Sequence, residues 1–153
     1  MKSLFPIAII LLGGACGCYA ADDLAVVVNK SVALDTLSAS DVRVMILGEK
    51  PKWPDGKAVI AVEAAPESPE RAMQLKTVNK MTDAALKRYY MLAAFNGKDT
   101  APPKDLPSAA ALKQFVAGNP GAIGCIFAAD VDASVKVLKV DGVAPGDPAY
   151  KLR

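Results

Sequence analysis

The sequence contains no histidine, and its three cysteines are Cys16, Cys18 and Cys125. Without histidine, every Ser-His or Cys-His catalytic arrangement is excluded, and so is a zinc site built from histidine and cysteine clusters. Carboxylates are abundant, but none has the spacing of a catalytic acid/base pair or of a calcium loop. The sequence therefore favours a protein that is not an enzyme, and it predicts no cofactor and no metal site.

The sequence also has no large excess of positive or negative charge. Eighteen Lys and Arg against 16 Asp and Glu give a net charge of +2. A near-neutral chain without a basic block has no electrostatic footprint for nucleic acid or for an acidic membrane surface. We therefore expect a partner that is a small solute or a protein.

The first 20 residues have the pattern of an export signal. Lys2 supplies the positive start, an apolar run follows, and small residues stand before the predicted cleavage site after Ala20. The apolar run is shorter than the ~20 residues of a transmembrane helix. We expect a cleaved signal peptide over residues 1–20 and a periplasmic product. A lipid anchor at Cys16 is the weaker alternative, because the usual leucine three residues earlier is absent.

The remaining residues, 21–153, have the length of one domain. Buried apolar runs predict strands near 24–29, 58–63 and 122–127, and partial alternation predicts a more exposed strand over 135–140. Helix starts are predicted at Ser38 or Ser40, Ser68, Thr82 and Ser108, because serine and threonine cap free backbone N–H groups. Strands alternating with helices indicate an α/β domain, a central sheet flanked by helices. The tail after Asp141 is expected to fray.

The most informative segment is Ser68-Pro69-Glu70-Arg71, which follows a strand and opens a helix. A capped helix start directs N–H donors and partial positive charge toward one spot, where an anion can bind. Ser68 and Arg71 are therefore the candidate ligand-binding residues, while Glu70 opposes an anion. The simpler interpretation, which we favour, is a helix cap with a surface arginine paired to Glu67 or Glu70.

Three further features have two interpretations each. Trp53 lies in a turn. Its two interpretations are a contact surface or, more often in such turns, a side chain that covers the edge of the core and donates its N–H to a carbonyl. Tyr89, Tyr90 and Phe95 are expected as core and rim residues of a helix rather than as a binding site. Cys125 lies in a buried run and is expected to act as a small hydrophobe, not as a reactive thiol.

Several segments, in this order, resemble one known family. They are Leu37-Ser38…Asp41-Val42…Leu47-Gly48, then Trp53-Pro54-Asp55-Gly56, then Tyr89-Tyr90 with Phe95-Asn96-Gly97 and Pro102-Pro103, and finally Asn119-Pro120-Gly121-Ala122-Ile123-Gly124. They resemble the second lobe of the phosphate-binding proteins of bacterial ABC transporters. The resemblance implies a single lobe of the type II periplasmic-binding-protein fold over residues 21–153. It also implies phosphate or a related oxyanion as ligand, and a membrane transporter or sensor as partner.

The sequence departs from the family at the anion loop. Ser68 matches the serine of that loop and Arg71 a basic residue that often follows, but Pro69 replaces a glycine and Glu70 stands at a threonine position. The family's upstream arginine has no counterpart in Glu63-Ala64-Ala65. The chain is about half the family's length and lacks a first lobe to close a cleft. Two hypotheses remain: an exported solute-binding protein for phosphate or a similar oxyanion, or a ligand-free interaction module that binds a membrane sensor or transport component.

Overall fold

The computed structural model describes residues 22–153. The predicted signal peptide and the alternative lipid anchor at Cys16 therefore lie outside the described residues. No helix within residues 22–153 is both long enough and apolar enough to cross a bilayer.

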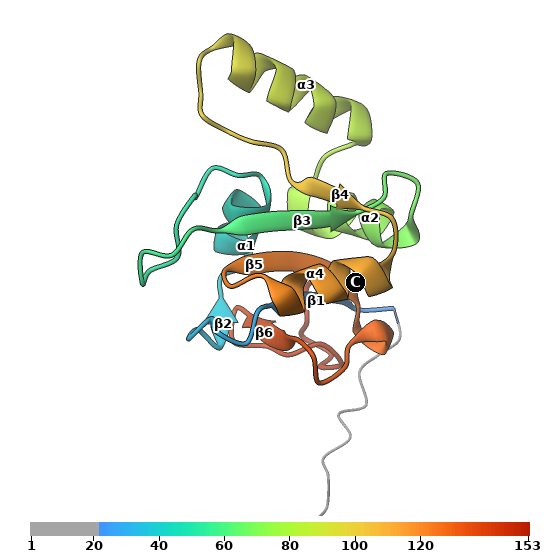
Figure 1. The fold of residues 1–153 in the computed structure, drawn as a ribbon. Helices are drawn as coiled ribbons and strands as arrows, with labels where there is room; N and C mark the ends of the chain where they lie inside the picture. The colour runs from blue at the N-terminus through green and yellow to red at the C-terminus, as the bar shows by residue number, and fades with distance from the viewer. Residues whose placement is uncertain (1–21) are drawn as a thin grey trace, which may run out of the picture.

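A six-stranded mixed sheet forms the centre of the domain, in the order β2-β6-β1-β5-β3-β4 (Figure 1). Its strands are β1 (Leu24–Val28), β2 (Thr36–Leu37), β3 (Ile60–Ala64), β4 (Lys104–Leu106), β5 (Ala122–Phe127) and β6 (Lys136–Val140). β1 is antiparallel to both of its neighbours, β5 and β6. The β2–β6, β3–β5 and β3–β4 pairs are parallel. The first strand within residues 22–153 is therefore an inner strand that pairs with the last two.

Hydroxyl side chains start the four α-helices where the sequence predicts them. The helices are α1 (Ala39–Ile46), α2 (Pro69–Gln74), α3 (Asp83–Phe95) and α4 (Ala109–Gly118), and η1 (Leu75–Asn79) and η2 (Ala128–Asp130) are a π-helical and a 3₁₀ turn. The caps are Ser38, Ser68, Thr82 and Ser108, each accepting a hydrogen bond from the backbone N–H three residues later. The α2 helix continues into η1, and Lys80 ends it in the left-handed conformation.

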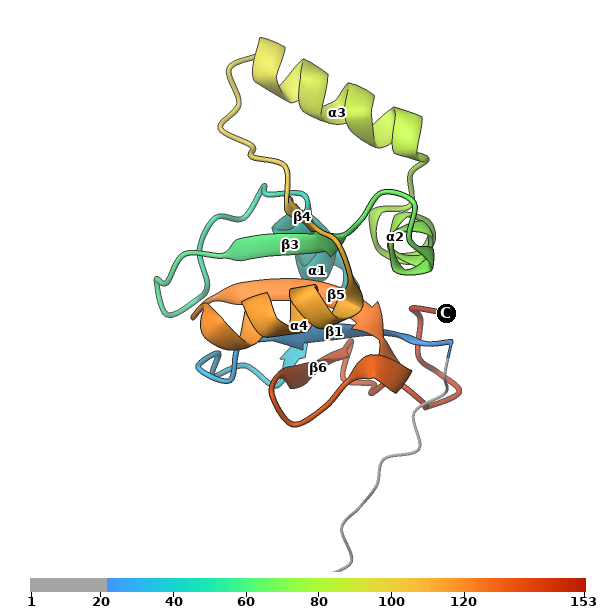
Figure 2. The same ribbon diagram turned by 45° about the vertical axis from the view of Figure 1, so that its right-hand side comes forward.

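Two apolar clusters cover the two faces of the sheet. Alternate residues of β1 point to opposite sides: Leu24 and Val26 join the cluster that holds α1 and η1, whereas Ala25 and Val27 join the cluster under α4. Figures 1 and 2 show α1 and α4 on opposite faces. All of β1 is buried, as expected for a strand covered on both sides.

The predicted α/β architecture and its four long strands are confirmed. β6 is more exposed than β1 or β5, also as predicted. The strands β2 and β4 were not predicted, because two or three residues carry no periodic signal. The prediction of a frayed tail is wrong. Tyr150 and Leu152 are buried, and the Leu24 N–H donates to the Leu152 carbonyl at 2.8 Å, so the tail is fixed against β1.

The turn before β3 is fastened by Trp53. Its indole is buried and donates from Nε1 to the Gly121 carbonyl at 2.9 Å, as the core-edge interpretation predicts. Gly121 has φ +85°, and a Cβ there would lie 2.3 Å from the Ala58 carbonyl oxygen. The contact therefore needs glycine for both its conformation and its size.

Gly121→Ala should destabilise the domain more than Gly56→Ala does. Gly56 also has positive φ, +86°, but a Cβ there meets nothing within 4 Å, so it isolates the conformational cost of about 1–2 kcal/mol. The clash at Gly121 should add about 1–3 kcal/mol. Denaturant unfolding followed by fluorescence of Trp53, the single tryptophan, measures both variants. Equal losses of unfolding free energy in the two variants would show that position 121 has room for a methyl group beside the Ala58 carbonyl.

Candidate functional site

The candidate site lies where β3 runs into α2. Ser68 is in extended conformation (φ −78°, ψ 149°), and its Oγ accepts from the Arg71 N–H at 3.2 Å. The same hydroxyl donates to the Ala65 carbonyl at 2.7 Å. The Ser68 hydroxyl is thus occupied as donor and as acceptor, in the role of a helix cap.

Few donors remain at this helix start. Pro69 has no N–H, the Arg71 N–H bonds to Ser68 Oγ, and the Ala72 N–H bonds to the Ser68 carbonyl at 3.1 Å. Of the first four helical residues, only Glu70 has an N–H without a partner inside this turn. The Glu70 carboxylate lies in the same turn, where it interacts favourably with the helix dipole and repels an anion.

The Arg71 side chain does not lie on the surface. Its side chain is only 7% exposed, and Nη1 forms an ion pair with Oε1 of Glu63, the fourth residue of β3. The Asp105 carboxylate on β4 lies 3.8 Å from the same nitrogen. The expected surface pairing with Glu67 or Glu70 is therefore wrong. A guanidinium at this depth needs a carboxylate beside it, and Glu67 is exposed on the loop.

Glu63 is held from two sides. Its Oε2 accepts a hydrogen bond from Gln74 Nε2 at 3.0 Å, and Gln74 is itself 1% exposed. The three side chains form a buried cluster, Glu63–Arg71–Gln74, that links β3 to α2. Glu63 is 3% exposed and is held by the ion pair with Arg71 and by one hydrogen bond from Gln74, so it is not positioned to swing aside into solvent.

Helix α3 lies next to this cluster. Burial raises the pKa of the Tyr90 hydroxyl to about 12, and the neighbouring Tyr89 acts in the same direction. The positive charge of Arg71 acts in the opposite direction. The Tyr89 hydroxyl donates to Glu49, which follows α1, so it fastens α3 to the body of the domain. Both tyrosines are partly buried, as predicted for core and rim residues. Phe95 was grouped with them, but its side chain is 89% exposed, so that prediction is wrong.

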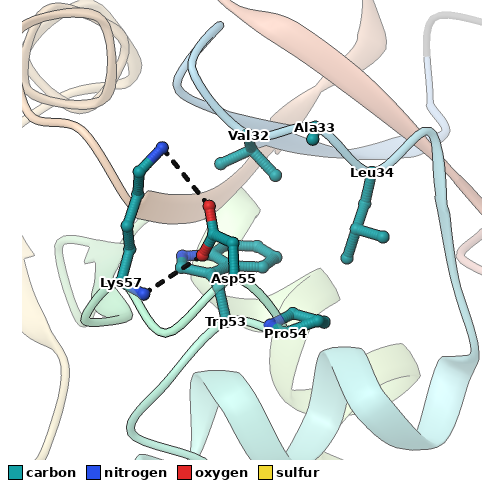
Figure 3. A pocket seen from close by; sticks show the side chains of 7 residues that line it. All are labelled: Val32, Ala33, Leu34, Trp53, Pro54, Asp55 and Lys57. Carbon is teal, nitrogen blue, oxygen red and sulfur yellow. Dashed lines mark hydrogen bonds and ion pairs between the residues drawn. The ribbon is translucent and has the colours of Figure 1, made fainter.

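A small apolar pocket lies beside Trp53 (Figure 3). It holds about 70 Å³, and apolar side chains of two loops line it: Val32, Ala33, Leu34, Trp53 and Pro54. The two charged lining residues, Lys57 and Asp55, bind each other, with Nζ–Oδ2 at 3.3 Å. The pocket is far smaller than the ~300–1,000 Å³ of typical ligand sites, and its polar groups are already paired. It does not have the features of a solute site.

A larger hollow of about 400 Å³ lies at the start of β3, lined in part by Lys50, Ile60 and Lys104. Ser68 lies beyond the other end of that strand, so the hollow and the candidate anion site are separate. Cys125 is fully buried on β5, and burial raises the pKa of its thiol to about 12, which fits the expected small hydrophobe. Within residues 22–153, no three metal-ligating side chains lie together.

Ser68 and Arg71 lie together, as the sequence predicts, whereas the contacts of Arg71 with Glu63 and Asp105 were not predicted. The available signal was Glu63 itself, a carboxylate directly after the apolar run that ends at Val62. A charged side chain inside a buried strand needs a partner of opposite charge. Asp105 gave no such signal, because it lies on a three-residue strand in a polar loop.

No model of a known protein family matches the sequence. Several solved structures do match in fold. One is a protein described as a phosphate ABC transporter substrate-binding protein with bound phosphate, from Clostridium perfringens. It has TM-score 0.66 and 23% identity, with 81% of this chain and 47% of that chain covered. Another is an ABC-type phosphate transport receptor from Vibrio cholerae, with TM-score 0.66, 21% identity, and 81% and 48% covered. PstS from Borrelia burgdorferi has TM-score 0.64, 12% identity, and 83% and 50% covered.

The chain thus spans about half the length of these neighbours. The neighbours are described as substrate-binding and transport proteins, not as enzymes. At these identities the likeness concerns the fold, and it confirms the resemblance inferred from the sequence. The domain has the mixed α/β fold of one lobe-sized half of phosphate-binding proteins of ABC transporters.

Proposed function

We propose that this protein is an exported interaction module, built on the lobe-sized domain described here, that binds a membrane sensor or transport component and holds no small ligand at the Ser68 corner. One observation carries the proposal: the Arg71 guanidinium already has its counter-charge inside the protein, on Glu63. The position that would attract an oxyanion is electrically satisfied by the chain's own carboxylate.

The surrounding charges support this proposal. Arg71 faces two carboxylates, Glu63 and Asp105, and Glu70 follows in the first turn of α2. A phosphate that approached this corner would meet more negative than positive charge. Near a surface, each carboxylate within a few ångströms of the phosphate disfavours its binding by about 1–4 kcal/mol of electrostatic repulsion. Arg71 would also have to leave the pair that allows it to be buried.

A second candidate function is binding of phosphate or a related oxyanion by Ser68 and Arg71, for transport or sensing. The position of these residues favours it: a strand runs into a capped helix, and the fold is that of a neighbour solved with phosphate bound. In this alternative Arg71 would exchange Glu63 for the ligand, and Glu70 would turn to solvent. Both candidates place the protein in the periplasm, as the pattern of residues 1–20 predicts.

Titration of the wild-type protein separates the two candidates. At low salt, phosphate, sulfate and small carboxylates at millimolar concentration should produce neither heat nor a thermal shift. Glu70→Thr removes a carboxylate that favours the helix dipole, so it should lower stability by a few tenths to ~1 kcal/mol and leave anion affinity unchanged. Tighter anion binding by Glu70→Thr would support the second candidate and contradict the first.

Glu63→Gln tests the internal counter-charge directly. The variant keeps the shape of the side chain but leaves the buried Arg71 charge with only the exposed Asp105 carboxylate, at 3.8 Å, so unfolding should cost about 3–5 kcal/mol less than in the wild type. Because Arg71 then lacks its buried carboxylate partner, added phosphate should raise the melting temperature of this variant more than that of the wild type.

Glu67→Gln is the matched control, because Glu67 is exposed on the loop between β3 and α2 and its replacement should change neither quantity. The double variant Glu63→Leu/Arg71→Met should recover most of the lost stability, since no charge is then buried. Wild-type stability in Glu63→Gln would mean that Glu63 does not balance Arg71, and the main support for the proposal would be lost.

A further inference from the structure

Helix α3 has two different faces. It is the outermost element at the β4 end of the molecule in both views (Figures 1 and 2). Leu86 and Ala93 are buried at 2% and 4% exposure and face the domain. Successive residues of a helix are rotated by about 100°, so positions 91 and 95 fall nearly opposite this pair. The exposed fractions agree: Met91 is 64%, Leu92 46% and Phe95 89% exposed.

The exposed side chains follow the spacing of a recognition helix. Arg88, Met91, Leu92 and Phe95 stand at positions i, i+3, i+4 and i+7, which form one stripe. An amphipathic helix that binds in a groove on another protein contacts the groove through apolar side chains at this spacing. A methionine, a leucine and a phenylalanine exposed together on one stripe are unusual for surface that faces only water.

The charges on this stripe indicate the chemistry of the partner. Lys87 is paired with Asp83 at 2.7 Å, whereas Arg88 makes no ion pair with any residue that the structure describes. One unpaired guanidinium beside three apolar anchors fits an apolar groove with a carboxylate at its rim. A lipid surface is the poorer match, since interfacial helices carry many cations on the polar face. In a symmetric contact with a second copy the stripe would face itself, and none of its four residues supplies a carboxylate for Arg88.

We propose that α3 docks, through Met91, Leu92 and Phe95, into an apolar groove on a partner protein, with Arg88 bound to a carboxylate at the rim of that groove. The inference rests on the proposed interaction function and names the face and the contact chemistry. The helix is already formed and fixed, by the Thr82 cap at its start and by Tyr89 bound to Glu49. Docking therefore does not have to order the helix.

Site-specific photocross-linking of the full chain in cells tests the proposal. Benzoylphenylalanine replaces Phe95 or, as control, Gln114, an exposed residue on α4. We expect a cross-link to one protein from position 95 and none from position 114. The purified periplasmic part of that protein is then titrated with wild type, Phe95→Ala, Arg88→Glu and Gln114→Ala. Since the altered side chains are exposed, the variants should fold, as circular dichroism can verify.

Phe95→Ala should weaken binding about tenfold or more, as for a central anchor, and Gln114→Ala should not change it. Arg88→Glu should also weaken binding, and replacement of the partner's rim carboxylate by lysine should restore it. Failure of either single variant to weaken binding would overturn the proposal. So would Phe95-dependent binding to vesicles of phosphatidylglycerol and phosphatidylethanolamine, or Phe95-dependent dimerisation in sedimentation.

The outcomes separate this inference from the function on which it rests. Cross-links from position 114 alone would leave the interaction function standing and remove α3 as its face. Phosphate binding by the wild type in titration would contradict the ligand-free function, while a Phe95-dependent partner would keep the docking face. Cross-links from neither position would contradict both.

Discussion

The ion pair between Glu63 and Arg71 connects the parts of the structure that matter for function. It joins the end of β3 to the first helical turn after it, and Asp105 brings the edge strand β4 to the same guanidinium. A charge at this depth is tolerated only with a partner of opposite sign, so the three elements hold one another in place. The same pair decides what the corner can attract, because structural and ligand-binding roles compete for one arginine.

Much of the fold follows from short-range signals in the sequence. Apolar runs marked the inner strands, and Ser38, Ser68, Thr82 and Ser108 marked the helix starts, since a capping hydroxyl acts within three residues of its own position. The two short strands could not be predicted in this way, because their pairing is decided by neighbours distant in the chain. The fixed tail was missed for the same reason: its partner, Leu24, lies at the other end of the described residues.

At the candidate site, too, features close in the sequence were predictable and long-range contacts were not. Ser68 and Arg71 are close in sequence, so their meeting at one helix start was predictable. That Arg71 turns inward depends on Glu63 and Gln74, and helical spacing alone does not say which face of α2 packs on the sheet. In α3, the apolar residues Leu86, Met91, Leu92 and Phe95 look alike in the sequence. Only tertiary packing separates the one that is buried from the three that are exposed.

The place of β1 in the sheet has a consequence for the order in which the molecule is completed. Within residues 22–153, the first strand pairs with the last two, and the Leu24 N–H donates to the Leu152 carbonyl. β1 therefore lacks both of its sheet neighbours until β5 and β6 have been made. A chain with such distant pairings folds late and slowly. The central pairing of the sheet therefore forms only after β5, β6 and the segment that holds Leu152 have been made.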